Sequence, residues 1–455
     1  MAPPELGSIL HRKLTKKSVT PGILLCLALF CAFGSAAQAP APGTPPAARA
    51  ETPGQRVSSA VVPPDVPPAY QDLYSMLEEK IAGFAGKIPS QENTASAAVN
   101  FGGELLTANA HRGVQLLLPK TREGVRVELD RLRALGAKSV TVAVGFPILY
   151  RPFLEWNGDP GDYQGLVDFY KQLAADVRSR GMQLVVESGA LFPGSYSVGS
   201  GFKLAEYYGT LSNQEYIAGR AEMAATIARE IRPDLLVVGS EPDTEAKISS
   251  KAFLGTPNGF ALLVAKIVTR VRAEGGRGIP IGAGVGVWKQ DGEEYIRSVV
   301  RAAPKLDFVD LHVYPVNGNS LDNLIRFTDV TESLGKRTAI CEAWLLKERD
   351  GEFGKLDAVF DAGVFARDAF SFWAPLDQKF LDALVRFARW KEVLLLSPYW
   401  TRYFHAYLQY DEVRKLTPTQ ITARANAAAA AAMLQNQFSE AGEAYRRAIS
   451  EMTTP

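Results

Sequence analysis

Eight short apolar runs recur along the chain, and longer segments of helical periodicity separate them. Each run is rich in Val, Ile or Leu and closes near Gly, Pro or a polar residue. This composition is typical of strands that are buried on both faces of a parallel sheet. We therefore expect strands at 96–102, 139–147, 183–189, 235–241, 279–287, 308–315, 338–344 and 393–400.

The segments between these runs predict amphipathic helices. In one of them Val125, Leu129 and Leu132 recur at helical spacing, and Gly136 follows where a helix would be capped. Eight strand–helix units between residues 70 and 415 predict a (β/α)8, or TIM, barrel with parallel strands. A doubly wound open sheet is disfavoured because no run is followed by a phosphate-binding glycine fingerprint.

The N-terminal 39 residues predict a secretory signal. Basic residues precede the eleven-residue apolar run ILLCLALFCAF, and the small residues GSAAQA follow it. The run is shorter than the roughly 20 residues that cross a bilayer, although an uncleaved N-terminal anchor stays an alternative. Residues 40–69 are rich in Pro and Ala and predict an extended linker, with structure beginning near Tyr70. We expect export to the periplasm or the extracellular space.

Charge and cysteine content exclude several classes of function. The chain has 50 basic and 49 acidic residues, so its charge favours neither nucleic acid nor an anionic membrane as a partner. Two of the three cysteines lie in the signal, which leaves Cys341 without a disulfide partner. Beyond the signal only His111, His312 and His405 remain, and no HxH or HExxH motif is present. We therefore expect no metal and no cofactor.

Three glutamates stand at the ends of expected strands. In a (β/α)8 barrel the active site lies at the C-terminal ends of the strands. Glu187, Glu241 and Glu342 close the third, fourth and seventh runs. A pair of carboxyl groups about 5 Å apart is what a retaining glycosidase needs, one as general acid and one as nucleophile. Their surroundings must then keep the acid protonated and the nucleophile ionised.

Further polar and aromatic residues accompany these glutamates. His312 and Tyr314 share one face of the sixth run and can donate hydrogen bonds to carboxylates. Trp344 and Trp400 offer flat apolar faces on which a sugar ring can stack. Asn100, near the end of the first run, is a further candidate for binding substrate.

Each of these residues also has a structural interpretation. A single glutamate at a strand end is often solvated or ion-paired, and Glu187 has Arg112 as a candidate partner. His312 has the alternative of a satisfied core histidine, and Trp400 that of a packing residue. Cys341 points away from its neighbouring glutamate and is interpreted as core filler.

The joint placement of these motifs resembles clan A of the glycoside hydrolases, retaining (β/α)8 enzymes. The resemblance covers roughly residues 95 to 415. It implies that Glu241, in the sequence GSEP, is the acid/base and that Glu342, in ICEAW, is the nucleophile. It also implies that Tyr314 lies near the nucleophile and that Trp400 floors the subsite of the cleaved sugar.

The chain departs from the clan at Ser240, where most members have an asparagine that binds the sugar 2-hydroxyl. The resemblance implies hydrolysis of O-glycosidic bonds in a polysaccharide or oligosaccharide, with transglycosylation by the same carboxylates as a variant. A carbohydrate-binding barrel without catalysis, or an envelope scaffold protein, is the alternative.

The C-terminal residues 416–455 predict helices. The segment 422–455 resembles one tetratricopeptide repeat, with Ala441, Tyr445 and Ala448 in the second-helix pattern. One repeat cannot bury its own apolar face. We expect its first helix to serve as the eighth barrel helix with the second packed over it, or the segment to bind a protein partner. The chain itself is expected to be a monomer.

Overall fold

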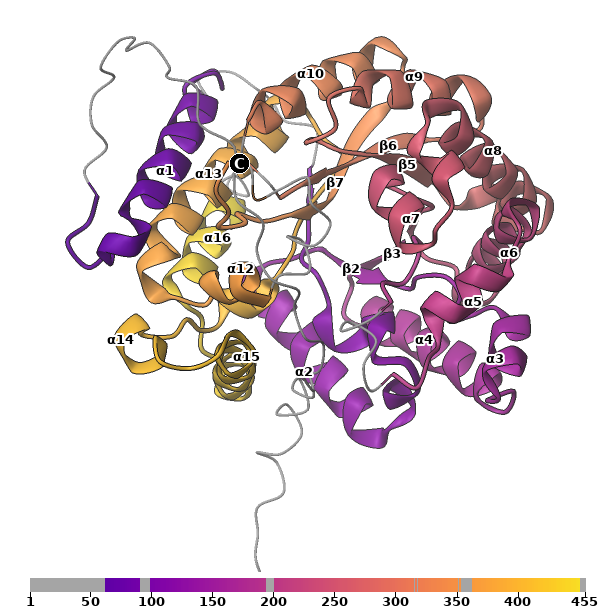
Figure 1. Cartoon of the computed structure of the whole chain (residues 1–455), viewed down its shortest axis with the longest axis horizontal. Coiled ribbons are helices and arrows are strands. Elements are labelled where there is room, and N and C mark those ends of the chain that lie inside the picture. Colours follow the sequence, from indigo (N-terminus) through magenta and orange to yellow (C-terminus); the bar gives the residue numbers. More distant parts are fainter. Residues whose placement is uncertain are drawn as a thin grey trace, which may run out of the picture.

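A computed structural model describes residues 62–90, 99–193, 200–314, 316, 318–350, 352 and 362–450. It contains eight parallel strands, hydrogen-bonded in the order β1-β8-β7-β6-β5-β4-β3-β2 (Figure 1). The expected signal segment and most of the expected linker lie outside the described residues. The strands are β1 (Asn100–Phe101), β2 (Ser139–Ala143), β3 (Gln183–Glu187), β4 (Leu235–Val237), β5 (Ile281–Gly286), β6 (Phe308–Val313), β7 (Arg337–Ala343) and β8 (Leu395–Pro398).

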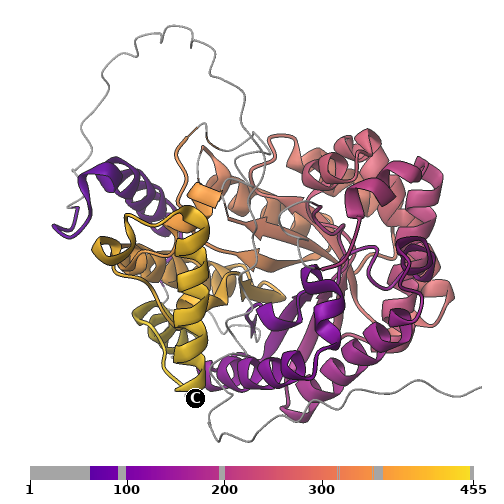
Figure 2. The same cartoon turned by 60° about the horizontal axis from the view of Figure 1, so that its bottom comes forward.

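Backbone hydrogen bonds close the sheet between its first two strands. Leu105 N donates to Thr141 O at 2.8 Å, and Thr141 N donates to Gly103 O at 3.1 Å. The residues that follow β1 therefore continue beside β2, and the cylinder is complete. The predicted (β/α)8 barrel is confirmed, and Figure 2 shows its strands inside a ring of helices.

Helices alternate with the strands around the barrel. Where the apolar periodicity predicted a helix at α2, its apolar stripe of Val125, Leu129 and Leu132 is buried and Gly136 ends it with a φ of 100°. The helices are α1 (Gln71–Ala85), α2 (Pro119–Leu135), α3 (Arg151–Asn157), α4 (Asp162–Ser179), α5 (Leu204–Thr210), α6 (Asn213–Thr226), α7 (Pro242–Ile248), α8 (Pro257–Ala273), α9 (Gly292–Ala302), α10 (Ser320–Ser333), α12 (Ala362–Arg367), α13 (Ala374–Trp390), α14 (Tyr410–Val413), α15 (Pro418–Leu434) and α16 (Glu440–Ser450).

Helix α1 precedes the first strand and packs against α13 on the outside of the barrel (Figure 1). Its buried face carries Leu73, Leu77, Ile81 and Phe84 at spacings of three and four residues. Structure begins before Tyr70, because Val66 is already buried in the core. None of the helices among the described residues is long and apolar enough to span a membrane.

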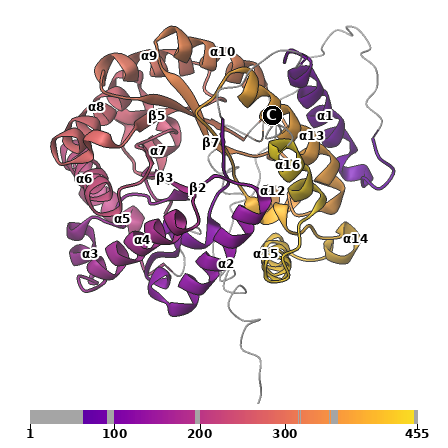
Figure 3. The same cartoon turned by 180° about the vertical axis from the view of Figure 1, so that it is seen from behind.

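The C-terminal hairpin completes the helix ring in a way that differs from the expectation. Helix α16, the second of the pair, packs against both α13 and α2, while α15 packs against α12 and α2 (Figure 3). Tyr445 Oη, on α16, donates to Gly102 O beside β1 at 2.9 Å. The second helix therefore occupies the eighth position, and the expectation for the first helix is wrong. Helix α16 brings the fully buried Tyr445 to this position, whereas α15 has eight alanines among its 17 residues.

The interior of the cylinder contains a small apolar cluster below the site. Its residues are buried and come from β3, β4, β6, β7 and β8. Cys341 is a fully buried member, in keeping with its interpretation as core filler. The cluster consists of Val185, Leu235, Val237, Phe308, Ala339, Cys341 and Leu395.

Candidate active site

A pocket of about 100 Å³ opens where the strands end. It brings together side chains that are far apart along the chain, from β3, the segment after β4, β6 and β7. Among the predicted site residues, those that line it are Glu187, Ser240, Glu241, His312 and Glu342.

Glu241 reaches the pocket beyond the end of β4. The strand ladder stops at Val237, but Val238 N still donates to Gly282 O at 2.8 Å and Gly239 O accepts from Gly284 N at 2.9 Å. The segment thus runs beside β5 until Glu241 becomes the residue before α7. The expected strand was too long at this end, yet Glu241 still points into the pocket.

His312 lies at the centre of the site with carboxylates on both sides. Its Nδ1 is 2.8 Å from Glu241 Oε1 and 3.5 Å from Glu342 Oε2. Its Nε2 is 3.1 Å from Glu187 Oε1 and 3.1 Å from Asp310 Oδ2. One imidazole therefore contacts four carboxylates.

These distances limit the separation of the two predicted catalytic groups. Both oxygens are measured from the same nitrogen, so Glu241 Oε1 and Glu342 Oε2 are at most about 6.3 Å apart. Retaining glycosidases place their carboxyl groups about 5 to 5.5 Å apart, and inverting enzymes about 6.5 to 9.5 Å. This limit applies to one oxygen of each carboxyl group and is compatible with the retaining arrangement.

Asp310 is a site residue that the sequence analysis did not single out. Its side chain is fully buried below His312. Its Oδ1 accepts a hydrogen bond from Cys341 N at 3.0 Å, and Oδ2 accepts one from Ser240 Oγ. The signal was its position two residues before His312 on a strand, which puts both side chains on one face.

The carboxylates favour the charged form of His312. Burial lowers the pKa of His312, but Glu342 and Asp310 raise it and leave it well above its usual value. Burial raises the pKa of Asp310, but the charge of His312 and the hydroxyl of Ser240 bring it below its usual value. Asp310 and His312 thus form a buried ion pair.

Glu342 and Glu187, in contrast to Asp310, have raised pKa values. Burial, reinforced by neighbouring carboxylates, raises the pKa of Glu342 well above its usual value although His312 lowers it. Burial likewise raises the pKa of Glu187. As the expected nucleophile Glu342 should be ionised, whereas its buried surroundings favour the protonated form.

The hydroxyl of Tyr314 donates to Glu241 Oε1 at 2.8 Å, and its ring lies 4.6 Å from the ring of Trp288. The resemblance placed this tyrosine near Glu342. Burial raises the pKa of Tyr314 well above its usual value, and both Glu241 and Glu342 add to this shift, so Tyr314 lies near both glutamates. Its hydrogen bond goes to Glu241, so Oε1 of that residue receives two donors.

Trp344 and Trp400 lie outside the carboxylate pocket. They line a smaller cavity of about 30 Å³, and Tyr399 lines both cavities. The guanidinium of Arg402 lies 3.8 Å from the ring of Trp400, and Glu104 accepts a hydrogen bond from Trp400 N at 3.0 Å. The two indole rings contact each other at 5.3 Å and form an aromatic wall beside the pocket.

Glu104 is a second residue that the sequence analysis missed. It is buried, and burial raises its pKa to about 8 although Arg402 lowers it. Its position just after the first apolar run was the available signal, by the same rule that selected the other strand-end glutamates. The expected strand ended too early to include it.

Asn100 does not belong to the site, and the expectation is wrong. It is the first residue of β1, in register with Leu395 at the start of β8, and its amide donates to Gln183 at the start of β3. These positions lie at the opposite end of the barrel. The error arose because only pairing with β8 shows where the short strand begins.

His111 does reach the pocket. Its Nε2 accepts a hydrogen bond from Phe192 N at 3.0 Å, and burial lowers its pKa to about 4. It is therefore a neutral polar group at one wall. Arg112, named above as a candidate partner of Glu187, does not line the pocket.

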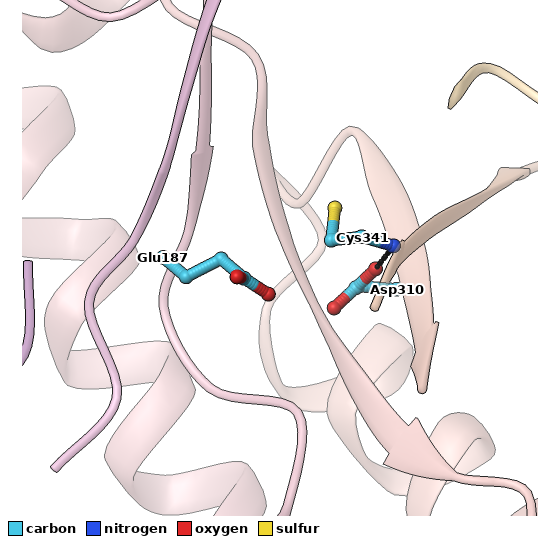
Figure 4. Close-up of side chains that lie close together, drawn as sticks. All are labelled: Glu187, Asp310 and Cys341. Carbon is cyan, nitrogen blue, oxygen red and sulfur yellow. Dashed lines mark hydrogen bonds between the residues drawn. The ribbon is translucent and has the colours of Figure 1, made fainter. Parts of the chain in front are cut away.

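Two sets of side chains lie close enough to be considered as metal ligands. Ligand atoms of Glu187, Asp310 and Cys341 lie within 4.8 Å of one another (Figure 4). Those of Glu187, His312 and Glu342 do so as well. Burial raises the pKa of the Cys341 thiol well above its usual value, and His312 favours its doubly protonated form. Binding a metal at either set would therefore require Cys341 or His312 to lose a proton.

No protein-family model and no curated protein sequence matches the chain. Solved structures match its fold. The exo-beta-1,4-mannosidase Op5Man5 from Opitutaceae bacterium strain TAV5 matches with a TM-score of 0.52 and 15% identity, over 79% of this chain and 60% of the mannosidase. GH5_18 from Streptomyces cattleya, in complex with GlcNAc, matches with a TM-score of 0.49 and 16% identity, over 79% of this chain and 82% of its own.

The chain has the barrel fold of the mannosidase. It spans 60% of the mannosidase's length, and at 15% identity the likeness concerns the fold alone. What this chain does must therefore be argued from its own pocket.

Proposed function

We propose that the chain is an exported retaining glycoside hydrolase that cleaves O-glycosidic bonds of a polysaccharide or oligosaccharide. The observation that carries the proposal is the pair Glu241 and Glu342, held on one imidazole nitrogen with their oxygens no more than about 6.3 Å apart. An enzyme that shares the fold is an exo-beta-1,4-mannosidase, which supports the same class of reaction.

In this proposal Glu241 is the general acid. Its Oε1 accepts hydrogen bonds from Tyr314 and His312, while its Oε2 is buried with no partner among the described residues. The acid proton is therefore placed on Oε2. It passes to the glycosidic oxygen as the bond from that oxygen to the anomeric carbon breaks.

Glu342 is the nucleophile and forms a bond to the anomeric carbon. A water molecule later replaces it, giving one proton to Glu241 and its oxygen to the sugar. Glu342 must first lose the proton that its burial favours. His312 Nδ1 contacts both glutamates, so it can donate its proton to Oε1 of an ionised Glu241 and accept the proton of Glu342, with no net change of its own charge. Rotation of the Glu241 carboxyl group then brings that proton to the position of Oε2.

The charges of the pocket support an uncharged sugar as the substrate. Glu187, Glu241 and Glu342 line it, and none of the described residues that line it is Lys or Arg. A uronic acid or a sulfated sugar would place a further anion beside these carboxylates, which costs free energy in a buried site.

Mechanism-based labelling tests the proposal. We expect 2-deoxy-2-fluoroglycosyl fluorides from a panel of neutral sugars to form a long-lived covalent glycosyl-enzyme at Glu342. Peptide mass spectrometry locates the labelled residue. Glu342→Gln should abolish labelling, and Glu241→Gln should slow turnover about 10²- to 10⁴-fold for substrates with poor leaving groups. Cleavage products that retain the anomeric configuration support the double displacement. Inverted products, or labelling elsewhere, would contradict it.

A carbohydrate-binding barrel without catalysis is the second candidate. The observation in its favour concerns Ser240. Its hydroxyl donates its hydrogen bond to Asp310, so this donor does not serve a sugar 2-hydroxyl. This candidate predicts glycan binding that persists in both glutamate variants, with no covalent labelling and no turnover of the same panel.

A further inference from the structure

Asp310 contacts both of the chain segments that carry the predicted catalytic glutamates. Ser240 directly precedes Glu241, and Cys341 directly precedes Glu342. The hydroxyl of Ser240 and the backbone N–H of Cys341 both donate to the carboxylate of Asp310. One buried carboxylate thereby joins the segment after β4 to strand β7.

Asp310 also contacts the histidine that lies between the glutamates. Its Oδ2 is 3.1 Å from His312 Nε2, on the side of the ring opposite to the nitrogen that contacts Glu241 and Glu342. The side chain of Asp310 is 0% exposed and that of His312 is 7% exposed. Water therefore screens this ion pair poorly.

We propose that Asp310 is the positioning residue of this site: it fixes the spacing of Glu241 and Glu342 and holds His312 as the charged group that moves a proton between them. This inference rests on the proposed function, because it assigns those two glutamates their catalytic roles. Asp310 does not line the pocket and acts through Ser240, Cys341 and His312.

The proposal accounts for the departure at Ser240. A serine hydroxyl is short and donates one hydrogen bond, and here that bond goes down to Asp310. An asparagine at this position would aim a longer amide at the sugar. The serine therefore serves the spacing of the carboxylates.

Other groups also act on His312, so the effect of Asp310 must be separated from theirs. The titratable groups that face the imidazole are Glu187 from β3, Glu241 from the segment after β4, and Glu342 from β7. Of the four carboxylates around the ring, only Asp310 has a side chain with no exposure. Its removal should therefore change the charge of His312 without opening the pocket.

The test compares Asp310→Asn with Glu128→Gln. Glu128 is a buried carboxylate of α2 that accepts hydrogen bonds from Leu106 N and Thr107 N, so its variant loses a buried charge elsewhere. The midpoint at which His312 loses its proton is measured by NMR of the ligand-free protein, with His312→Gln to assign the signal. We expect Asp310→Asn to lower this midpoint by about 1 to 3 pH units, and Glu128→Gln to leave it unchanged.

The activity of the same variants gives a second readout. Loss of the Asp310 charge favours deprotonation of His312, which supplies the proton of the acid, so the alkaline limb of the kcat/KM profile should move to lower pH in Asp310→Asn and stay in place in Glu128→Gln. A wild-type alkaline limb together with a wild-type NMR midpoint would overturn the proposal. If the wild type itself shows no turnover and no labelling, the proposed function fails, whereas the NMR midpoint still tests the role of Asp310.

Ser240→Ala provides the test if Asp310→Asn does not fold. Its control is Ser397→Ala, which removes another buried serine hydroxyl, one that accepts from Thr141 Oγ1 at 2.8 Å. We expect Ser240→Ala to lower kcat at least about tenfold and to displace the His312 midpoint without ligand. A role in sugar binding alone would leave that midpoint unchanged, and this result would overturn the proposal.

Discussion

Replacing Arg220 should lower the free energy of unfolding more than replacing a charged residue on the surface does. Arg220 lies on α6 and is fully buried, and its Nε is 2.9 Å from Glu245 Oε1 on α7. Its guanidinium also donates to Val238 O at 2.8 Å and to Ser188 O. It thus supports the two segments that carry Glu187 and Glu241.

The size of the effect follows from burial. Removing one partner of a buried ion pair costs about 3 to 5 kcal/mol, because the other charge stays buried without compensation. Arg220→Met also leaves two carbonyl groups without a donor, which places the expected loss at the upper end of that range. The double variant Arg220→Met/Glu245→Leu removes the stranded charge and should recover most of the loss.

Urea unfolding of these variants, with the free energy of unfolding extrapolated to water, measures the prediction. The control is Arg270→Met, which breaks an ion pair of 2.6 Å to Glu274 in which the arginine side chain is 51% exposed. This shorter but exposed pair should contribute less than about 1 kcal/mol. The reasoning would be refuted if Arg220→Met cost no more than Arg270→Met.

Three further predictions concern charge and packing. Because burial and Glu187 raise the pKa of Glu342, kcat/KM should fall as the pH drops at values above the usual 4.5, and Glu187→Gln should move this acid limb to lower pH. Burial raises the pKa of Glu104 in the folded protein to about 8, against 4.5 for an unperturbed glutamate, so its contribution to stability is fully present below about pH 4.5 and is lost as the pH rises to about 8. In Glu104→Gln the free energy of unfolding, measured with urea, should therefore depend less on pH over this range. Tyr445→Phe should cost about 1 kcal/mol in the same assay, through its hydrogen bond to Gly102, and an unchanged midpoint would contradict the role of α16 in closing the ring.

Much of the fold could be predicted because its signals are local. Apolar residues at strand or helix spacing act on their own segment, so the eight runs and the helix at Pro119–Leu135 were found without any tertiary information. The strand-end rule then found Glu241 and Glu342, because parallel strands of a barrel all end at one rim. It failed at Asn100, since the start of a two-residue strand is set by its pairing with β8.

The sequence by itself therefore determined the architecture, the rim that carries the site and the two glutamates that face each other there. Only the tertiary structure decided that His312 contacts four carboxylates, that Asp310 lies beneath it, and that Tyr314 binds Glu241. The physical reason is that hydrogen-bond partners and pKa values depend on burial and on neighbours from other strands. Those neighbours come together only when the barrel closes, and the distances between them cannot be read from the sequence of any single segment.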